Sequence, residues 1–129
     1  MKSFIDSNIF IYAAAGLQES IDILSEAVSS TWSGYSTITR IEVLGYKKFN
    51  KDEEMKLFRM LSCFHECEIT KPVVDKAIEL RKSGSIKIPD AIIAAGAIIH
   101  DATLITRNVS DFKDVMDLKV LTLLANEVA

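Results

Sequence analysis

The chain has few of the residues that mark several common classes of protein. Its 129 residues include two cysteines, two prolines and five glycines, too few for a disulfide framework or a collagenous repeat. The longest unbroken apolar run, Ala91–Ile99, has nine residues, whereas a membrane-spanning helix needs about 20. No hydrophobic signal region precedes Asp6. We therefore expect a cytoplasmic protein with no membrane partner.

The two cysteines lie close together, in the segment Cys63-Phe64-His65-Glu66-Cys67. Two thiolates and one imidazole leave a structural zinc site one ligand short. We interpret the segment as the end of a helix that carries small apolar thiols.

The overall charge does not mark a nucleic-acid-binding tail. The chain has 15 Lys and Arg against 18 Asp and Glu, a net charge of −3, and no block of basic residues. Hydrophobic residues make up 49% of it, enough for a core, which excludes global disorder. The length predicts one domain over residues 1–129.

Short apolar runs alternate with segments of helical periodicity along the chain. The predicted strands cover residues 3–6, 34–37, 66–69, 103–106 and 119–122. The predicted helices cover residues 8–14, 19–30, 40–48, 52–63, 72–84 and 89–100. This alternation predicts an α/β fold with a parallel sheet and helices on both faces. Because such sheets bind ligands beyond the carboxyl ends of their strands, the residues after each strand are candidate site residues.

Four acidic residues stand where acids are uncommon. Asp6 lies between a buried strand and an apolar helix, Glu42 lies on a helix that must pack, Asp90 opens an apolar helix, and Asp111 follows a strand. Two carboxylates about 4 Å apart repel by about 4 kcal/mol at an effective dielectric of 20, so a convergent set favours a bound cation. Oxygen ligands with no Cys or His near them select Mg²⁺ or Mn²⁺.

Each of these acids also has an ordinary structural explanation. Asp6 can cap a helix, Asp90 suits the positive end of a helix, Glu42 can be a surface residue and Asp111 a loop acid. Removing these four from the 18 acids leaves 14 against 15 bases, so the rest of the chain is near +1. With a metal bound, such a surface accepts a phosphodiester backbone despite the net −3.

The chain carries four short segments, FIDSNI at 4–9, STITRIEVL at 36–44, IPDAIIAA at 88–95 and LITRNVSDF at 104–112. Each alone is a weak signal, but the ordered set resembles the PIN-domain family, and within it the VapC-type toxins of type II toxin–antitoxin systems. The resemblance implies a three-layer α/β/α fold around a central parallel sheet of about five strands. It also implies a metal-dependent endoribonuclease that is restrained by a cognate antitoxin protein.

The resemblance assigns roles to individual residues. The first three acids of the family fall on Asp6, Glu42 and Asp90. The fourth falls on Asn108, where many members carry an acid, or on Asp111, the position that other members use.

Three further positions follow from the same resemblance. Asn8 matches the polar residue that helps to orient the first acid, and Thr106 is expected to hydrogen-bond within the site. Gly96 stands where the family usually has threonine, which we interpret as a change in packing.

The mechanism that follows is hydrolysis of RNA by a metal-activated water, which leaves a 5′-phosphate and a 3′-hydroxyl. The four acids hold one or two Mg²⁺ ions, for which Mn²⁺ can substitute. Arg40 and Arg107 are candidate contacts to RNA phosphate. The apolar helices leave more apolar surface than a five-stranded core needs, which predicts a homodimer and a groove for the antitoxin.

Two other functions fit parts of the sequence. A phosphatase of the haloacid-dehalogenase kind would use Asp6 as its nucleophile, but it needs a second Asp two residues later, where this chain has Asn8. A catalytically weak PIN-like module that binds RNA or protein would explain Asn108. Phosphate-binding glycine loops and the Gly-x-Ser-x-Gly elbow do not occur in the sequence.

Overall fold

The computed structural model describes residues 1–121, in which five strands alternate with six α-helices. The strands are β1 (Lys2–Ile5), β2 (Trp32–Ser36), β3 (His65–Cys67), β4 (Thr103–Ile105) and β5 (Val120–Leu121). The helices are α1 (Ser7–Ala14), α2 (Gln18–Val28), α3 (Thr37–Leu44), α4 (Lys51–Ser62), α5 (Lys71–Ser83), α6 (Ile88–Ile99) and a 3₁₀ turn, η1 (Val109–Phe112). The predicted order of elements is confirmed; Thr122, the end of the last predicted strand, lies outside the described residues.

Helix α3 is the element whose position differs most from the sequence prediction of 40–48. It begins at Thr37 because the Ser36 side chain caps it, accepting a hydrogen bond from the Ile38 N–H at 3.2 Å. It ends at Leu44, before Gly45. Helix α3 therefore follows β2 directly and carries Glu42.

All strand pairs in the sheet are parallel, and the strand order is β3-β2-β1-β4-β5. The chain moves outward from the central strand β1 to β3, and then crosses to the other side of β1 for β4 and β5. The order therefore reverses between β1 and β4, and the carboxyl ends at such a point form a crevice where ligands bind. The backbone joins the two ends there, because the Asp6 N–H donates to the Ile105 carbonyl at 3.0 Å.

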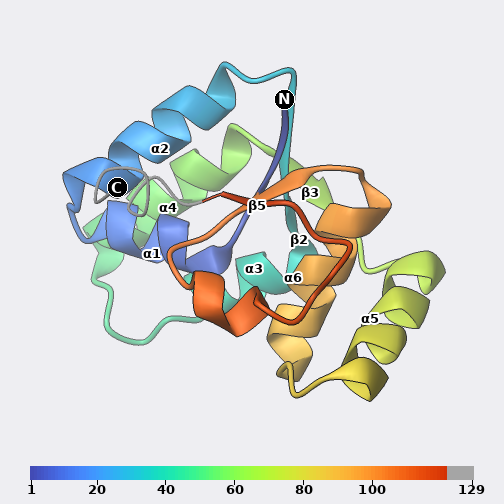
Figure 1. The fold of residues 1–129 in the computed structure, drawn as a ribbon. Helices are drawn as coiled ribbons and strands as arrows, with labels where there is room; N and C mark the ends of the chain where they lie inside the picture. Colours follow the sequence, from blue (N-terminus) through green and yellow to red (C-terminus); the bar gives the residue numbers. More distant parts are fainter. Residues whose placement is uncertain (122–129) are drawn as a thin grey trace.

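Alternation along the strands divides the core between two faces. Phe4 packs with α5 and α6 on one face, and Ile5 packs with α1, α2 and α4 on the other. Both side chains are fully buried. Figure 1 shows the two groups of helices on opposite sides of the sheet, which confirms the three-layer α/β/α architecture. No helix within residues 1–121 has both the length and the apolar character of a membrane span.

Gly96 lies where α6 crosses the central strand. A Cβ atom at this position would lie 2.7 Å from Cζ of Phe4, closer than carbon atoms approach. The absence of a side chain therefore lets α6 pack against the buried Phe4 ring, in agreement with the packing interpretation of this glycine.

The replacement Gly96→Ala should destabilise the fold by about 1–3 kcal/mol, because the added methyl group overpacks the core against Phe4. Urea unfolding of the purified protein measures this difference. The double variant Phe4→Leu/Gly96→Ala should lose less than the sum of the two single variants, because the smaller side chain makes room for the methyl group. A Gly96→Ala protein that unfolds at the same urea concentration as the parent would contradict this packing.

Candidate active site

Asp6 occupies the crevice at the end of the central strand. Its side chain is only 5% exposed. One carboxylate oxygen, Oδ1, accepts a hydrogen bond from the Ser7 N–H at 2.7 Å, and the other, Oδ2, accepts one from the Thr106 hydroxyl at 2.6 Å. Asp6 is therefore both the N-cap of α1 and a buried acid that is tied to the end of β4.

Glu42 reaches the same place from α3. Its Oε1 atom accepts a hydrogen bond from the Ser7 hydroxyl at 2.6 Å. The oxygen of this hydroxyl also lies 2.9 Å from the hydroxyl oxygen of Thr39, which is on α3 one turn before Glu42. Ser7 thus joins the first two acids, since its N–H binds Asp6 and its hydroxyl binds Glu42.

The sequence analysis missed Ser7 and Thr39 as members of the site. Both residues are buried. The only signals available were their positions: Ser7 directly follows a candidate ligand, and Thr39 lies three residues before another, which places it on the same face of a helix. Such hydroxyls are too common at helix starts to be singled out by sequence.

Asp90 and Asp111 complete the group of acids. Asp90 is half-buried in the first turn of α6, and Asp111 is exposed in η1. Burial raises the pKa of the Asp90 carboxyl, and the negative charges of Asp111 and then Glu42 raise it further, against an opposing effect of Lys87. The turn η1, in orange-red in Figure 1, packs against α6.

The pKa of Asp6 shows that its ionised carboxylate is disfavoured, mainly by burial. Burial raises the pKa from 3.8 to about 6, although the hydrogen bonds from Thr106 and Ser7 act to lower it. The charges of Asp90 and Glu42 add to the rise. The charge of Glu42 thus acts on both Asp6 and Asp90, and the charge of Asp111 acts on Asp90; that the four acids form one metal site stays a prediction.

A divalent cation fits this group by its chemistry. The donors are carboxylate oxygens, which Mg²⁺ and Mn²⁺ prefer, and a cation would offset the cost of burying the ionised Asp6 carboxylate beside Asp90 and Glu42. Among residues 1–121, no three acidic, histidine or cysteine side chains are already gathered around one point as a metal shell. The carboxylates would have to rotate toward a shared ion, and mutual repulsion opposes that rotation until the ion is present.

The three supporting residues lie around the acids with different roles. Thr106 is fully buried, donates to Asp6 and accepts a hydrogen bond from the backbone N–H of Asn108 at 3.0 Å. The Asn108 side chain is exposed. The Oδ1 atom of Asn8 is buried and has no hydrogen-bond partner within residues 1–121.

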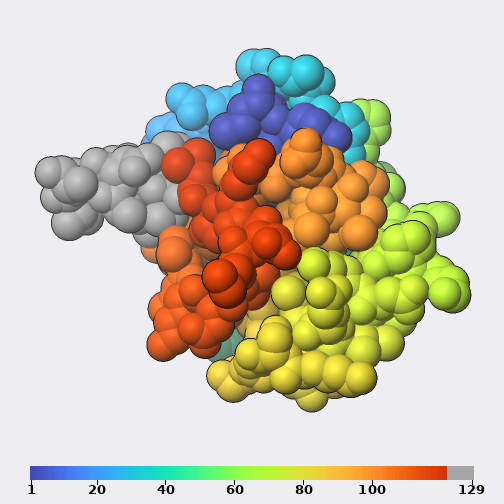
Figure 2. All heavy atoms as spheres, turned by 45° about the vertical axis from the view of Figure 1, so that its right-hand side comes forward, coloured from blue at the N-terminus to red at the C-terminus, as the bar shows by residue number. Residues whose placement is uncertain are grey.

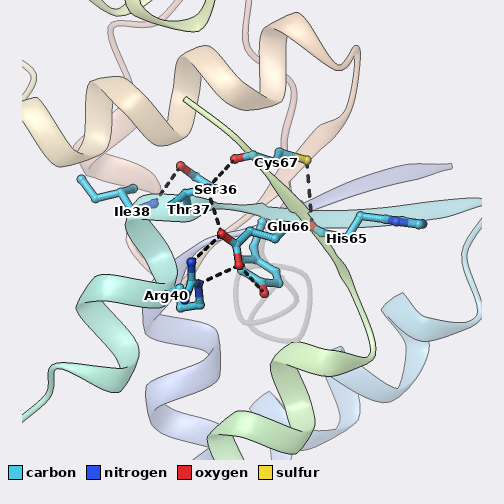
Figure 3. A network of polar contacts seen from close by, with 8 residues as sticks. Ser36, Thr37, Ile38, Arg40, His65, Glu66 and Cys67 are labelled. Atoms are coloured by element: carbon cyan, nitrogen blue, oxygen red, sulfur yellow. Dashed lines mark hydrogen bonds and ion pairs between the residues drawn. The ribbon is translucent and has the colours of Figure 1, made fainter. Parts of the chain in front are cut away.

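Arg40 takes part in an ion pair at the edge of the sheet. Its Nε and NH2 atoms lie 2.7 and 3.2 Å from the two carboxylate oxygens of Glu66 on β3. Thr37 donates its hydroxyl to the same carboxylate at 3.0 Å, as Figure 3 shows. The Arg40 side chain is still 53% exposed, so a contact to phosphate by this residue stays a prediction.

Arg107 directly follows Thr106 and is more enclosed than Arg40. It forms an ion pair with Glu19 of α2, and its guanidinium carbon lies 4.5 Å from the centre of the Tyr12 ring on α1. These two contacts hold the segment after β4 against α1 and α2. A contact between Arg107 and phosphate also stays a prediction, and it would have to compete with Glu19.

The replacement Asp6→Asn should stabilise the metal-free protein at pH 7. The folded state binds a proton at Asp6 more tightly than the unfolded state does, so this group lowers stability as the pH rises from about 4 to 6. A shift of about two pKa units corresponds to at most about 3 kcal/mol. Asparagine keeps an oxygen that can accept a hydrogen bond from the Ser7 N–H. The gain in the free energy of unfolding should vanish near pH 3. Urea unfolding in EDTA at both pH values measures it.

The exposed Asp52 in the first turn of α4 supplies a matched control. The replacement Asp52→Asn should not stabilise the protein at pH 7. An Asp6→Asn protein that is less stable than the parent at pH 7, with the same deficit at pH 3, would show that the carboxylate is not strained by burial.

Comparisons with known proteins agree with this geometry. The chain matches the PIN domain family over residues 3–118. A search of curated proteins finds no match.

Several solved structures are similar to this chain. A protein in a toxin–antitoxin complex from Klebsiella pneumoniae is 33% identical, with a TM-score of 0.78 over 93% of this chain and 96% of that one. A chain of VapBC2 from Rickettsia felis, bound to a DNA fragment from its promoter, is 24% identical, with a TM-score of 0.81 over 95% and 98%. A chain of VapBC-1 from nontypeable Haemophilus influenzae is 21% identical, with a TM-score of 0.76 over 96% and 99%. The solved structures share the fold of this chain, and the match over residues 3–118 shows that the chain belongs to the PIN domain family.

Proposed function

We propose that this protein is a metal-dependent endoribonuclease and the toxin of a toxin–antitoxin pair. VapC-type PIN domains are nucleases, and the match covers nearly the whole chain. The observation that carries the proposal is the buried Asp6 carboxylate, whose pKa burial raises to about 6, with the charges of Asp90 and Glu42 adding to the rise. A buried acid of this kind needs a compensating cation, and a cation at this place would attract an RNA phosphate.

Asp6, Glu42 and Asp90 are the residues that would hold Mg²⁺, or Mn²⁺ in its place. Asp111 is the fourth candidate, because its charge acts on Asp90, whereas Asn108 brings no charge. When bound, the ion would lower the pKa of a water molecule and stabilise negative charge on the phosphate.

The chain's own residues prepare this site. Ser7 and Thr106 hold the two oxygens of Asp6, which fixes the orientation of the carboxylate. Ser7 also positions Glu42. Asn8, which directly follows Ser7 in the chain, would help to orient Asp6, and Lys87, near Asp90, brings positive charge for the substrate.

We also propose an antitoxin, a second copy of the chain and a cytoplasmic setting. The Klebsiella pneumoniae relative is part of a toxin–antitoxin complex. Two exposed apolar surfaces support protein partners: one on α4 with Met55 and Phe58, and one between α5 and α6 with Ile78 and Ile88. Surfaces of this kind on a small domain commonly mark protein contacts.

A catalytically weak binding module is the second candidate function, and Asn108 is the observation that favours it. This candidate predicts the same fold without cleavage. Membership of the PIN family argues against the phosphatase interpretation, which also lacks its second aspartate at Asn8.

Single replacements of the acids test the proposal. Asp6→Asn, Glu42→Gln and Asp90→Asn should each lower RNA cleavage in Mg²⁺ by about 100-fold or more, because each removes a ligand of the ion that activates water. Chelation by EDTA should abolish cleavage by the parent. The rate of cleavage of a labelled single-stranded RNA is the measurement, and Asp52→Asn should cleave like the parent.

The result that would overturn this proposal is cleavage by the Asp6→Asn protein at the parental rate. A parent that binds RNA and cleaves none of a total RNA sample, with or without Mg²⁺ or Mn²⁺, would favour the binding module instead.

A separate comparison identifies the fourth position. If Asp111 is the fourth ligand, Asp111→Asn should slow cleavage by about tenfold or more, whereas Asn108→Ala should change it by less than about threefold, since outer ligands of a metal site contribute about 10- to 100-fold. The reverse order of effects would assign the fourth position to Asn108.

A further inference from the structure

A cavity opens directly beside the outer two acids of the site. It has a volume of about 170 Å³, and Asp90 and Asp111 form part of its lining. Its walls are the connection from α5 to α6 and the segment from η1 to Val115. Figure 2 shows the yellow atoms around residue 84 beside the orange-red atoms of residues 110–115.

The wall formed by the α5–α6 connection is held in place by the protein itself. The Arg81 guanidinium donates from NH1 to the Ile86 carbonyl at 2.8 Å, and the Ser83 hydroxyl donates to the Leu80 carbonyl at 3.3 Å. Leu80 and Val115 are buried in the floor of the cavity. The cavity is therefore preformed and has an apolar base.

The upper part of the cavity carries hydroxyls and charges. Ser85 and Ser110 line it, and within residues 1–121 their hydroxyls make no hydrogen bond to protein. A free hydroxyl can both donate and accept. Groups of this kind above an apolar floor suit a flat ring with polar edges.

The charges of the lining depend on the metal. Lys87 and Lys113 oppose Asp90, Asp111 and Asp114, which gives two positive against three negative charges, a net −1. A divalent cation at the acids would change this to +1. The cavity would then attract a polyanion only when the neighbouring site is loaded.

We propose that this cavity receives one unpaired nucleobase of the RNA next to the scissile phosphate, with Lys113 facing an adjoining phosphate. The inference rests on the proposed ribonuclease function. The volume is smaller than the roughly 300–1,000 Å³ of small-molecule sites, so it fits one ring of a larger molecule. Bases of single-stranded RNA are the part that proteins read by apolar contact and edge hydrogen bonds. The cavity is thus a specificity pocket of the cleavage site.

Blocking the cavity at Gly84 is the direct test. A Cβ atom at Gly84 would lie 3.9 Å from Cβ of Asp114, an ordinary contact across the cavity lining. Gly84→Ala should therefore behave like the parent, whereas the branched side chain of Gly84→Leu should fill the space. Because the leucine side chain would occupy the place of the base, Gly84→Leu should raise KM for a mapped RNA substrate about tenfold and change kcat little.

Abasic substrates show whether a base is what the cavity holds. Removing one base beside the cut should raise KM about tenfold for the parent and should have no further effect in Gly84→Leu. Thermal unfolding of Gly84→Leu should match that of Gly84→Ala. If KM is the same for both Gly84 variants, or if every abasic substrate binds the parent like the intact RNA, the proposal is overturned.

A binding measurement separates this inference from the proposed function. Fluorescence anisotropy of a labelled single-stranded RNA in Ca²⁺ gives Kd, and Lys113→Ala should lower the slope of log Kd against log salt by about 0.7. Lys119 is an exposed lysine that lies beside Asp101, at the opposite end of the sheet. As the control, Lys119→Ala should leave this slope unchanged. If RNA binding depends on Gly84 but the parent does not cleave RNA, only the nuclease function is overturned. If the parent cleaves RNA, and neither the Gly84 variants change KM nor Lys113→Ala changes the salt slope, only the proposed role of the cavity is overturned.

Discussion

The structure depends on a carboxylate that is buried at the end of the central strand. Burying an ionised acid costs free energy, and Asp6 recovers only part of it through the Ser7 N–H and the Thr106 hydroxyl. The same two contacts tie the start of α1 and the end of β4 to one point. The site is therefore an anion-rich crevice, and a bound cation can offset the part of the burial cost that these hydrogen bonds leave uncompensated.

The route of the chain explains why distant acids meet. Hydrophobic alternation and turn residues predicted nearly every element, and the alternation of strands with helices predicted a parallel sheet. Once the sheet is parallel, residues after β1 and β4 must lie at the same edge. Asp6 and Thr106 could therefore be placed together at this edge from the sequence. The ordered segments around Glu42 and Asp90 then indicated that the helices carrying these two acids belong to the same site.

What the sequence could not supply were contacts between side chains. The link from Ser7 to Glu42 depends on the orientation of α3, which begins three residues earlier than its periodicity indicated. Arg40 and Arg107 were predicted as candidate contacts to RNA phosphate, and the structure pairs them with Glu66 and Glu19 across the fold. These partners lie 26 and 88 residues away in sequence, and no local pattern relates them.

The acids, the cation and the RNA form one electrostatic system, in which the positive charge of the cation offsets the negative charges of the acids and of the RNA phosphate. Titration calorimetry with Mn²⁺ at pH 7.5 tests this most directly, on the parent and on the Asp6→Asn and Asp90→Asn variants. The account predicts saturable binding by the parent that each variant loses. A parent that takes up no Mn²⁺, or variants that bind it as tightly as the parent, would contradict it.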